Sequence, residues 1–337
     1  MKTRQFGSLG WELSEIGFGG WAIGGWWGDQ RDEDSLAALN AYLDKGGNFI
    51  DTAQYYGDGR SENLIGKILK ERRDQRIYVA TKLPPKDLEW NPPSWTPHTN
   101  AFPYDYIIQG VETSLKNLDV ECLDIYQLHT WCESWNTVDE IFEAGERLKK
   151  EGKILAYGIS ATESFPENVI GALETGAIDS LQMIFNLFEQ HPRETLLPAC
   201  ERHGVGTIIR VPFDEGSLTG KYTGNETFGE DDFRSLYFRG NNLKATVQRV
   251  NKIKEWKDRN LPDMSMAELA LRWVLSHETV DTVIPGIRNL RQAELNTAPS
   301  DGNYLSAQQL RELKQYAWRR NPWAEDLDLL ENIKGYQ

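Results

Sequence analysis

The chain has 337 residues, enough for one large domain or two of ordinary size. Its content of 39% hydrophobic and 26% charged residues is typical of a globular protein. The net charge of −14 makes nucleic acid and anionic membranes poor partners. The N-terminal residues lack the apolar run of a signal peptide, and no stretch reaches the ~20 apolar residues of a membrane helix. We therefore expect a cytoplasmic protein that is not bound to a membrane.

Short apolar segments alternate with amphipathic ones along the chain. Residues 1–14 predict a β-hairpin, and an apolar strand at 16–19 then leads into a loop rich in glycine and tryptophan. Further strands are predicted at residues 49–50, 77–80, 123–128, 154–159, 181–185, 207–211 and 280–284. Helices are predicted at 36–43, 61–69 with Ser61 as its N-cap, 107–118, 138–150, 166–173, 194–202, 246–256, 267–275, 290–295 and 306–319.

Eight strand–helix steps built from short buried strands are typical of a closed parallel barrel. An open doubly wound sheet shares the alternation and stays as the alternative. No linker or shift in composition marks a second domain, so we expect one domain over residues 1–337, with a C-terminal helix and tail at 305–337. Two long loops, 84–103 and 212–242, follow strands, and in a barrel such loops lie at the catalytic face.

Polar residues stand at the ends of three predicted strands: Asp51, Lys82 and His129. Tyr56 follows Asp51 by five residues. Each residue alone is commonplace, because a strand-terminal acid is usually a turn residue and a lone histidine is usually a core residue. Strand ends share one rim of a barrel, however, so all four side chains are expected together.

These residue types suit the reduction of a carbonyl group. The reaction needs a hydride donor and an acid that protonates the developing alkoxide. A lysine cation beside Tyr56 would lower the phenol pKa toward the operating pH, and Asp51 would hold that lysine charged and in place. His129 could donate a hydrogen bond to the carbonyl oxygen.

The segment from Gly46 to Gly57, followed by Ser61 and Glu62, resembles the Asp–Tyr signature of the aldo-keto reductases. The resemblance extends over nearly the whole chain and includes the potassium-channel β-subunit-like branch of that family. It implies an α/β fold, a (β/α)8 TIM barrel with an N-terminal β-hairpin. It also implies a catalytic tetrad of Asp51, Tyr56, Lys82 and His129, with Tyr56 rather than Tyr55 as the acid.

The resemblance further implies NADPH bound in extended form without a Rossmann domain. The run from Gly17 to Ala22 fits a loose dinucleotide fingerprint, but it opens into a loop instead of a helix, so we interpret the match as chance. By resemblance, Phe185 replaces a tyrosine stacked on the nicotinamide, Asn186 helps to bind its carboxamide, and Arg288 contacts the 2′-phosphate. The implied cofactor-binding residues are Trp21, Asp51, Ser160, Gln182, Phe185, Pro212, Phe213, Gly216, Leu218, Gly220, Lys221, Gly286, Arg288, Gln292 and Asn296.

Twelve tryptophans are present, and seven of them, including Trp90, fall in loops expected at the catalytic face. Such a rim binds apolar or sugar-like molecules. We predict a small carbonyl substrate contacted by Trp21, Trp26, Tyr56, Trp95 and Trp131. The sequence leaves the substrate, the preferred direction of reaction and the formation of a homo-oligomer open.

Two other functions remain as alternatives to an NADPH-dependent reductase. One is a nucleotide-sensing regulatory subunit of the same fold. The other is a barrel glycosidase, which needs two carboxylates flanking one bond, whereas the strand ends offer one evident acid, Asp51. The three cysteines, Cys122, Cys132 and Cys200, have no metal-binding spacing, so neither a zinc site nor a disulfide framework is expected.

Overall fold

A computed structural model describes residues 1–319 of the 337-residue chain. Within them, eight parallel strands form one sheet in the order β10-β9-β8-β7-β6-β5-β4-β3. The strands are β3 (Phe18–Gly19), β4 (Phe49–Asp51), β5 (Tyr78–Leu83), β6 (Leu123–Leu128), β7 (Ile154–Ser160), β8 (Ser180–Ile184), β9 (Gly206–Arg210) and β10 (Thr282–Val283). Sequential parallel order excludes the doubly wound alternative, which requires the order to reverse.

The first and last strands of the sheet meet, which closes the barrel. Gly17 N–H donates to Val283 O at 2.8 Å, and Gly19 N–H donates to Pro285 O at 3.0 Å. A Cβ on Gly19 would lie 2.7 Å from Ile284 O, so only glycine allows this close backbone approach. The predicted (β/α)8 barrel is confirmed.

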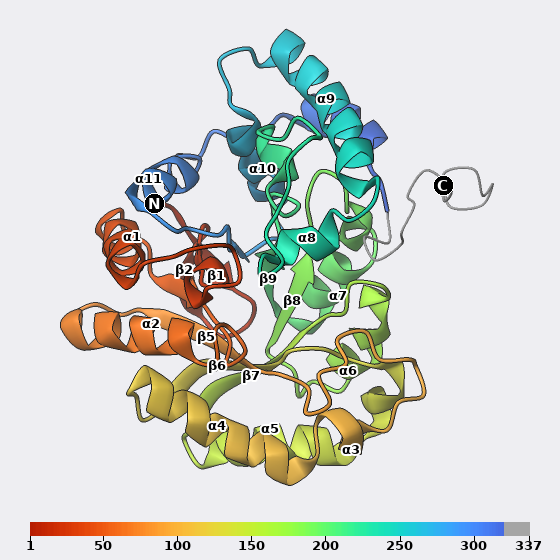
Figure 1. Ribbon diagram of the computed structural model, residues 1–337. Coiled ribbons are helices and arrows are strands. Elements are labelled where there is room, and N and C mark those ends of the chain that lie inside the picture. Colours follow the sequence, from red (N-terminus) through yellow and green to blue (C-terminus); the bar gives the residue numbers. More distant parts are fainter. Residues whose placement is uncertain (320–337) are drawn as a thin grey trace.

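Helices surround the barrel, as Figure 1 shows. Neighbours in this layer pack side by side, including α1 against α11 and α2 against α4. The helices are α1 (Asp32–Asp44), α2 (Arg60–Glu71), α3 (His98–Ala101), α4 (Tyr104–Leu118), α5 (Asp139–Lys150), α6 (Ile170–Glu174), α7 (Leu196–His203), α8 (Phe233–Tyr237), α9 (Asn242–Asn260), α10 (Met266–Leu275), α11 (Leu290–Thr297) and α12 (Ala307–Leu313). None of these helices combines the length and the apolar character needed to cross a bilayer.

The predicted N-terminal hairpin is present and covers the amino end of the barrel. Its strands, β1 (Thr3–Phe6) and β2 (Trp11–Ser14), pair antiparallel. Phe6 and Leu13 are fully buried and pack into a cluster with side chains from the parallel strands, among them Phe49 and Ile125. The opposite, carboxyl end of the barrel is thereby left for the long loops.

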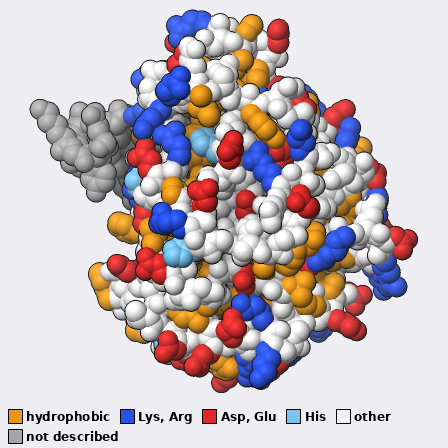
Figure 2. Space-filling model, turned by 180° about the vertical axis from the view of Figure 1, so that it is seen from behind, with side chains coloured by type: hydrophobic (Ala, Val, Ile, Leu, Met, Phe, Trp, Pro, Cys, Tyr) orange, Lys and Arg blue, Asp and Glu red, His pale blue; other side chains and the backbone are white. Residues whose placement is uncertain are grey.

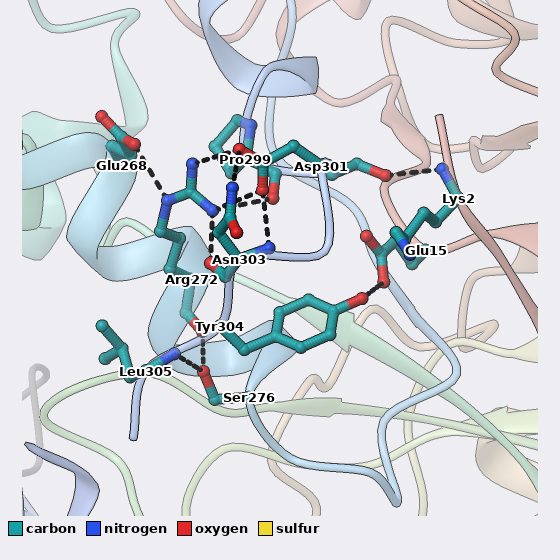
Figure 3. Close-up of polar contacts among 11 residues, drawn as sticks. Lys2, Glu15, Glu268, Arg272, Ser276, Pro299, Asp301, Asn303, Tyr304 and Leu305 are labelled. Atoms are coloured by element: carbon teal, nitrogen blue, oxygen red, sulfur yellow. Dashed lines mark hydrogen bonds and ion pairs between the residues drawn. The ribbon is translucent and has the colours of Figure 1, made fainter.

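The segment after α11 is tied to α10 and to the hairpin, as Figure 3 shows. Arg272 of α10 donates to Asp301 Oδ1 and Oδ2 at 2.7 and 2.9 Å and to Glu268 Oε1 at 2.9 Å. Tyr304 OH donates to the buried Glu15 at 2.7 Å. The last parallel strand and the helices that follow it are therefore anchored to the start of the chain.

Two local predictions were wrong. Ser61 is not the N-cap of α2, since the helix begins at Arg60 and Ser61 Oγ instead donates to Gly20 O at 3.0 Å and accepts from Thr52 Oγ1 at 2.8 Å. The C-terminal helix is shorter than 306–319, because α12 ends at Leu313 and a 3₁₀ turn follows. Residues 320–337, most of the predicted tail, lie outside the described part of the chain.

The surface carries charges of both signs. On the face shown in Figure 2, acidic and basic side chains are intermingled. Within residues 1–319, no group of three or more His, Cys, Asp and Glu side chains is arranged to hold a metal ion.

Candidate active site

A long cavity of about 1120 Å³ lies at the carboxyl ends of the barrel strands. One end contains Asp51, Tyr56 and His129, and the other contains Arg288 and Asn296. Both long loops contribute to its wall, Trp90 from 84–103 and Phe213 from 212–242. The barrel therefore brings the predicted catalytic residues and the predicted phosphate site to one continuous pocket.

Lys82 lies beneath the catalytic end and is fully buried. Its Nζ donates to Asp51 Oδ1 at 2.6 Å, to Thr52 O at 2.7 Å and to Tyr56 OH at 3.3 Å. Three acceptors match the three hydrogens of an ammonium group. Because the Tyr56 oxygen accepts a hydrogen bond from Lys82, the phenol hydrogen points toward another acceptor. Tyr56 lines the cavity, so a molecule in the cavity could be that acceptor.

The electrostatic environment keeps Tyr56 protonated. Burial, followed by the charge of Asp51, raises the pKa of Tyr56 well above its ordinary value, while Arg210 acts in the opposite direction. The expectation that the pKa of Tyr56 would be lowered toward the operating pH was wrong, because desolvation raises this pKa. Burial lowers the pKa of Lys82 and raises the pKa of Asp51, and their ion pair opposes both shifts.

His129 is a neutral imidazole at this site. Burial, with the nearby charges of Lys82 and Arg210, lowers its pKa well below the ordinary value. Its Nδ1 is buried and has no partner among residues 1–319. The ring lies edge-on to Tyr56, with centroids 5.7 Å apart. A neutral imidazole carries one N–H donor, which suits hydrogen bonding to a carbonyl oxygen.

Six rings line the catalytic end of the cavity in a closed cycle, which we call the aromatic collar. Each ring contacts the next, with centroid separations between 4.9 and 6.4 Å. In order, the members are Trp21, Trp26, Tyr55, Trp90, His129 and Tyr56. The predicted catalytic tyrosine and histidine are thus part of an apolar wall.

Two predicted substrate residues lie elsewhere. Trp131 is fully buried, packs against Trp135 and Phe142, and donates its Nε1–H to Asn136. Trp95 points into solvent, with 79% of its surface exposed. Neither lines the cavity. The prediction for Trp131 was wrong because this side chain points into the core behind the barrel rim. Trp95 is likewise not part of the cavity wall.

Three predicted cofactor residues are also outside the cavity wall. Phe185 is fully buried against Trp273, 4.6 Å between centroids, so it presents no face for stacking. Leu218 is a core residue and Gly220 lies beside the wall without lining it. At the ends of β8 and β9, Arg210 lines the cavity instead, and the sequence analysis missed this residue. Its position could have indicated a site residue, because Arg210 is a charged residue at the end of a buried barrel strand.

Asn186 does not line the cavity but shapes the loop after β9. Its Nδ2–H donates to Val211 O at 2.9 Å, and its Oδ1 accepts from two backbone N–H groups, including that of Phe188. Val211 adopts φ 55°, a conformation that β-branched residues rarely take. The contact holds the chain in a sharp bend immediately after Arg210.

In this loop, the Asp214 side chain is turned away from the cavity. It accepts hydrogen bonds from Tyr237 OH and Ser217 Oγ. Glu215 lines the cavity, together with Gly216 and Lys221. Residues 214–221 therefore present one amine and one carboxylate to the cavity, and Glu230, Asp231 and Asp232 line it further along the same loop.

Charged groups of both signs line the part of the cavity around α11, because Glu230, Asp231, Asp232 and Glu268 lie in the wall together with two arginines. Arg288 and Arg291 line it, with Gln292 and Asn296 on the same helix as Arg291. Arg288 donates to Gln30 Oε1 at 2.9 Å, to Trp27 O at 2.8 Å and to Asp29 O at 2.6 Å. The guanidinium that was predicted to bind phosphate thus also holds the 27–30 loop.

The remaining wall groups fit a nicotinamide dinucleotide. Gln182 Nε2–H donates to Asp51 Oδ2 at 2.7 Å, whereas its buried Oε1 has no partner within residues 1–319. An unpaired buried acceptor costs free energy, and a carboxamide N–H could satisfy it. Ser160 lines the cavity nearby, and the arginines at the far end suit phosphate groups.

Known proteins resemble this chain over most of its length. The model of the Aldo/keto reductase family matches residues 15–317. The aldo-keto reductase YhdN of Bacillus subtilis is 33% identical over 299 residues, 87% of each chain. Among solved structures, the holo form of AKR11C1 from Bacillus halodurans has a TM-score of 0.75 and 27% identity, covering 95% of this chain and 97% of that one. The glycerol dehydrogenase AKR11B4 from Gluconobacter oxydans has a TM-score of 0.76 and 29% identity, covering 96% and 98%. The chain belongs to the aldo/keto reductase family of oxidoreductases.

Proposed function

We propose that this protein reduces an aldehyde or ketone to an alcohol, with NADPH as the hydride donor and Tyr56 as the acid. The observation that carries the proposal is the Lys82 Nζ–Tyr56 OH hydrogen bond of 3.3 Å, which leaves the phenol hydrogen available to a molecule in the cavity. Gln182, Ser160, Lys221 and Arg288 would hold the cofactor, which would supply a hydride to the carbonyl carbon.

The residues of the chain complete the reaction. Tyr56 donates its proton to the carbonyl oxygen as the alkoxide develops, and Lys82 stabilises the resulting phenolate across their hydrogen bond. Asp51 holds Lys82 charged and oriented at 2.6 Å. His129, neutral, donates a hydrogen bond to the same oxygen. The aromatic collar excludes water around these groups.

The choice of NADPH rests on the arginines at the distal end of the cavity. Named relatives of the chain use both cofactors. The aldo-keto reductase yakc [NADP(+)] of Schizosaccharomyces pombe is 28% identical, and the NADH-specific methylglyoxal reductase of Escherichia coli is 26% identical. Arg288 offers a planar fork suited to a 2′-phosphate, which NADH lacks.

Replacement of Tyr56 tests the proposal directly. Tyr56→Phe should lower aldehyde-dependent NADPH oxidation by about 10²–10⁴-fold, because the acid is lost while the ring remains. Titration of NADPH against tryptophan fluorescence should still show binding. Tyr55→Phe is the matched control and should cost far less, because the cation of Lys82 contacts Tyr56. Undiminished turnover by Tyr56→Phe would exclude it as the acid.

A regulatory, nucleotide-sensing subunit is the second candidate. A plant relative from Arabidopsis thaliana, 27% identical over 89% of this chain, is named a probable voltage-gated potassium channel subunit beta. The same assay separates the two functions, since a purely regulatory subunit would bind NADPH and turn over no aldehyde in a broad panel. The glycosidase alternative is set aside, because the chain belongs to an oxidoreductase family.

A further inference from the structure

Glu62 is a buried carboxylate that the proposed reaction does not use. It belongs to the Ser61–Glu62 pair that follows the Asp–Tyr segment of the sequence, and it lies in the first turn of α2. The side chain is fully buried and does not line the cavity. An acid in this position does not touch a ligand in the cavity, so any effect on the reaction passes through other side chains.

Three uncharged side chains donate hydrogen bonds to Glu62. Its Oε1 accepts from Thr81 Oγ1 at 2.6 Å and from Ser114 Oγ at 2.7 Å. Its Oε2 accepts from Asn117 Nδ2 at 2.8 Å. Thr81 belongs to β5, whereas Ser114 and Asn117 belong to α4, which packs against α2 (Figure 1). Glu62 therefore joins α2 and α4 to the strand that carries Lys82.

The same contacts extend to the groups that hold the proposed acid. Thr81 immediately precedes Lys82 in β5. Ser114 Oγ accepts from Gln54 Nε2 at 2.9 Å, and the backbone N–H of Gln54 donates to Lys82 O at 3.2 Å. Gln54 lies two residues before Tyr56. The end of β5 and the loop that carries the phenol are therefore both fixed to this carboxylate, the first through Thr81 and the second through Ser114.

Hydrogen bonding alone does not require a charged residue at position 62. A glutamine has the same size, and its amide oxygen can accept from both hydroxyl groups. The amide of Asn117 can turn over and accept from the glutamine N–H. A carboxylate at this position instead carries the desolvation cost of a buried charge, and none of its three donors is positively charged. The negative charge therefore calls for an explanation of its own.

Lys82 supplies that explanation. Burial lowers the pKa of Lys82, whereas Asp51 raises it through their ion pair. The charge of Arg210 lowers this pKa further, and the charge of Glu62 raises it. Three further titratable groups near Lys82 or Glu62 are uncharged: Tyr56, Tyr126 and His129. Glu62 is thus a second buried anion that acts on the ammonium group, on the side away from the cavity.

We propose that Glu62 is a positioning residue of the reaction, whose carboxylate ties the end of β5 to the Tyr56 loop and whose negative charge keeps Lys82 an ammonium ion. The inference rests on the proposed reductase function and adds a residue to its machinery. Glu62 touches neither substrate nor cofactor in this scheme. It acts through Lys82, which must stay charged to stabilise the phenolate that Tyr56 leaves behind.

The pH dependence of Glu62→Gln tests the role of the charge. The readout is kcat for NADPH-dependent reduction across neutral and alkaline pH, with the aldehyde that the full chain turns over fastest in a panel including propanal and benzaldehyde. The alkaline fall of kcat should move to lower pH by about one unit, because Lys82 loses its proton more readily without the nearby negative charge. The KM for the aldehyde and the Kd for NADPH should stay unchanged, because Glu62 does not line the cavity.

Two further variants separate charge from packing. Asp124→Asn is the matched control, because it removes another buried carboxylate, at the start of the neighbouring strand β6, and should leave the alkaline fall of kcat in place. Glu62→Asp keeps the charge on a shorter side chain. Its kcat should fall, because the contacts with Thr81 and Ser114 are lost, while the pH of the alkaline fall stays the same. Glu62→Asp carries the test if Glu62→Gln fails to fold.

Three outcomes would overturn the inference. An alkaline fall at the same pH in Glu62→Gln and in the unsubstituted protein would do so while leaving the reductase function intact. A shift of the alkaline fall in Glu62→Asp would assign the effect to packing instead of charge. Absence of NADPH oxidation with every aldehyde would remove the proposed function itself and the inference with it.

Discussion

At the scale of single residues, Lys82 fixes the hydrogen-bonding role of the Tyr56 oxygen. Its three hydrogen bonds, to Asp51, Thr52 and Tyr56, use every hydrogen of the ammonium group. The Tyr56 oxygen is therefore an acceptor toward the protein interior and a donor toward the cavity. Burial and Asp51 together raise the pKa of Tyr56, which suits a phenol that gives up its proton only as the alkoxide forms.

A pH profile of each direction tests this arrangement. Reduction needs the protonated phenol, so its kcat should stay level from pH 6 to 9 and fall only as the pH approaches the raised pKa of Tyr56. Oxidation of the alcohol needs the phenolate, so its kcat should rise with pH over the same range. Steady-state rates in both directions provide the measurement. A fall in reduction between pH 6 and 8 would contradict a raised pKa at Tyr56.

At the scale of elements, Arg288 connects the start of α11 to the loop after β3. Its donors hold Trp27 O, Asp29 O and Gln30 Oε1, while its own N–H donates to Gln292 Oε1 at 2.8 Å. The element that would receive the phosphate end of the cofactor is thereby coupled to the loop that carries Trp26 of the aromatic collar.

Arg288→Gln should separate charge recognition from loop anchoring. We expect the Kd for NADPH to rise about 10- to 100-fold, because a charged hydrogen bond to phosphate is lost. The Kd for NADH should rise less, and only through a loosened 27–30 loop. Tryptophan fluorescence reports both titrations. Arg31→Gln, which removes an exposed ion pair with Asp34, serves as the control. Equal losses for the two cofactors would show that Arg288 acts only on the loop.

At the scale of the whole molecule, the two ends of the barrel have separate tasks. The hairpin and the buried cluster around Phe6 and Leu13 cover the amino end. The cavity, the aromatic collar and both long loops occupy the carboxyl end. A substitution at the amino end is therefore expected to change the stability of the fold without changing ligand binding at the carboxyl end.

Phe6→Ala tests this division. Loss of a fully buried phenylalanine should lower the free energy of unfolding by about 3–5 kcal/mol and reduce Tm. The Kd for NADPH at 20 °C should stay unchanged, because Phe6 itself does not line the cavity and belongs to the hairpin at the amino end. Leu155→Ala, at a side chain that is 47% exposed, should change Tm little. Loss of NADPH affinity in folded Phe6→Ala would contradict the separation of the two ends.

The barrel and the grouping of three polar side chains at its rim were predictable from the sequence. Alternating strands and helices specify the topology, and the carboxyl ends of parallel strands share one rim, so Asp51, Lys82 and His129 could be placed together from their positions alone. Tyr56, five residues after Asp51, was selected over Tyr55 by the resemblance to the aldo-keto reductases. At the end of a strand, the backbone restricts the directions in which a side chain can point.

The other residues of the cavity wall depend on how distant segments of the chain pack together. Trp131 turned into the core while Trp90 joined the aromatic collar, and Phe185 was buried while Arg210 faced the cavity. Arg288 proved to be shared with the 27–30 loop. Each of these outcomes depends on partners far along the chain, such as Trp273 for Phe185 and Glu163 for Arg210. The raised pKa of Tyr56 has the same origin, because desolvation arises only when distant segments pack around the phenol.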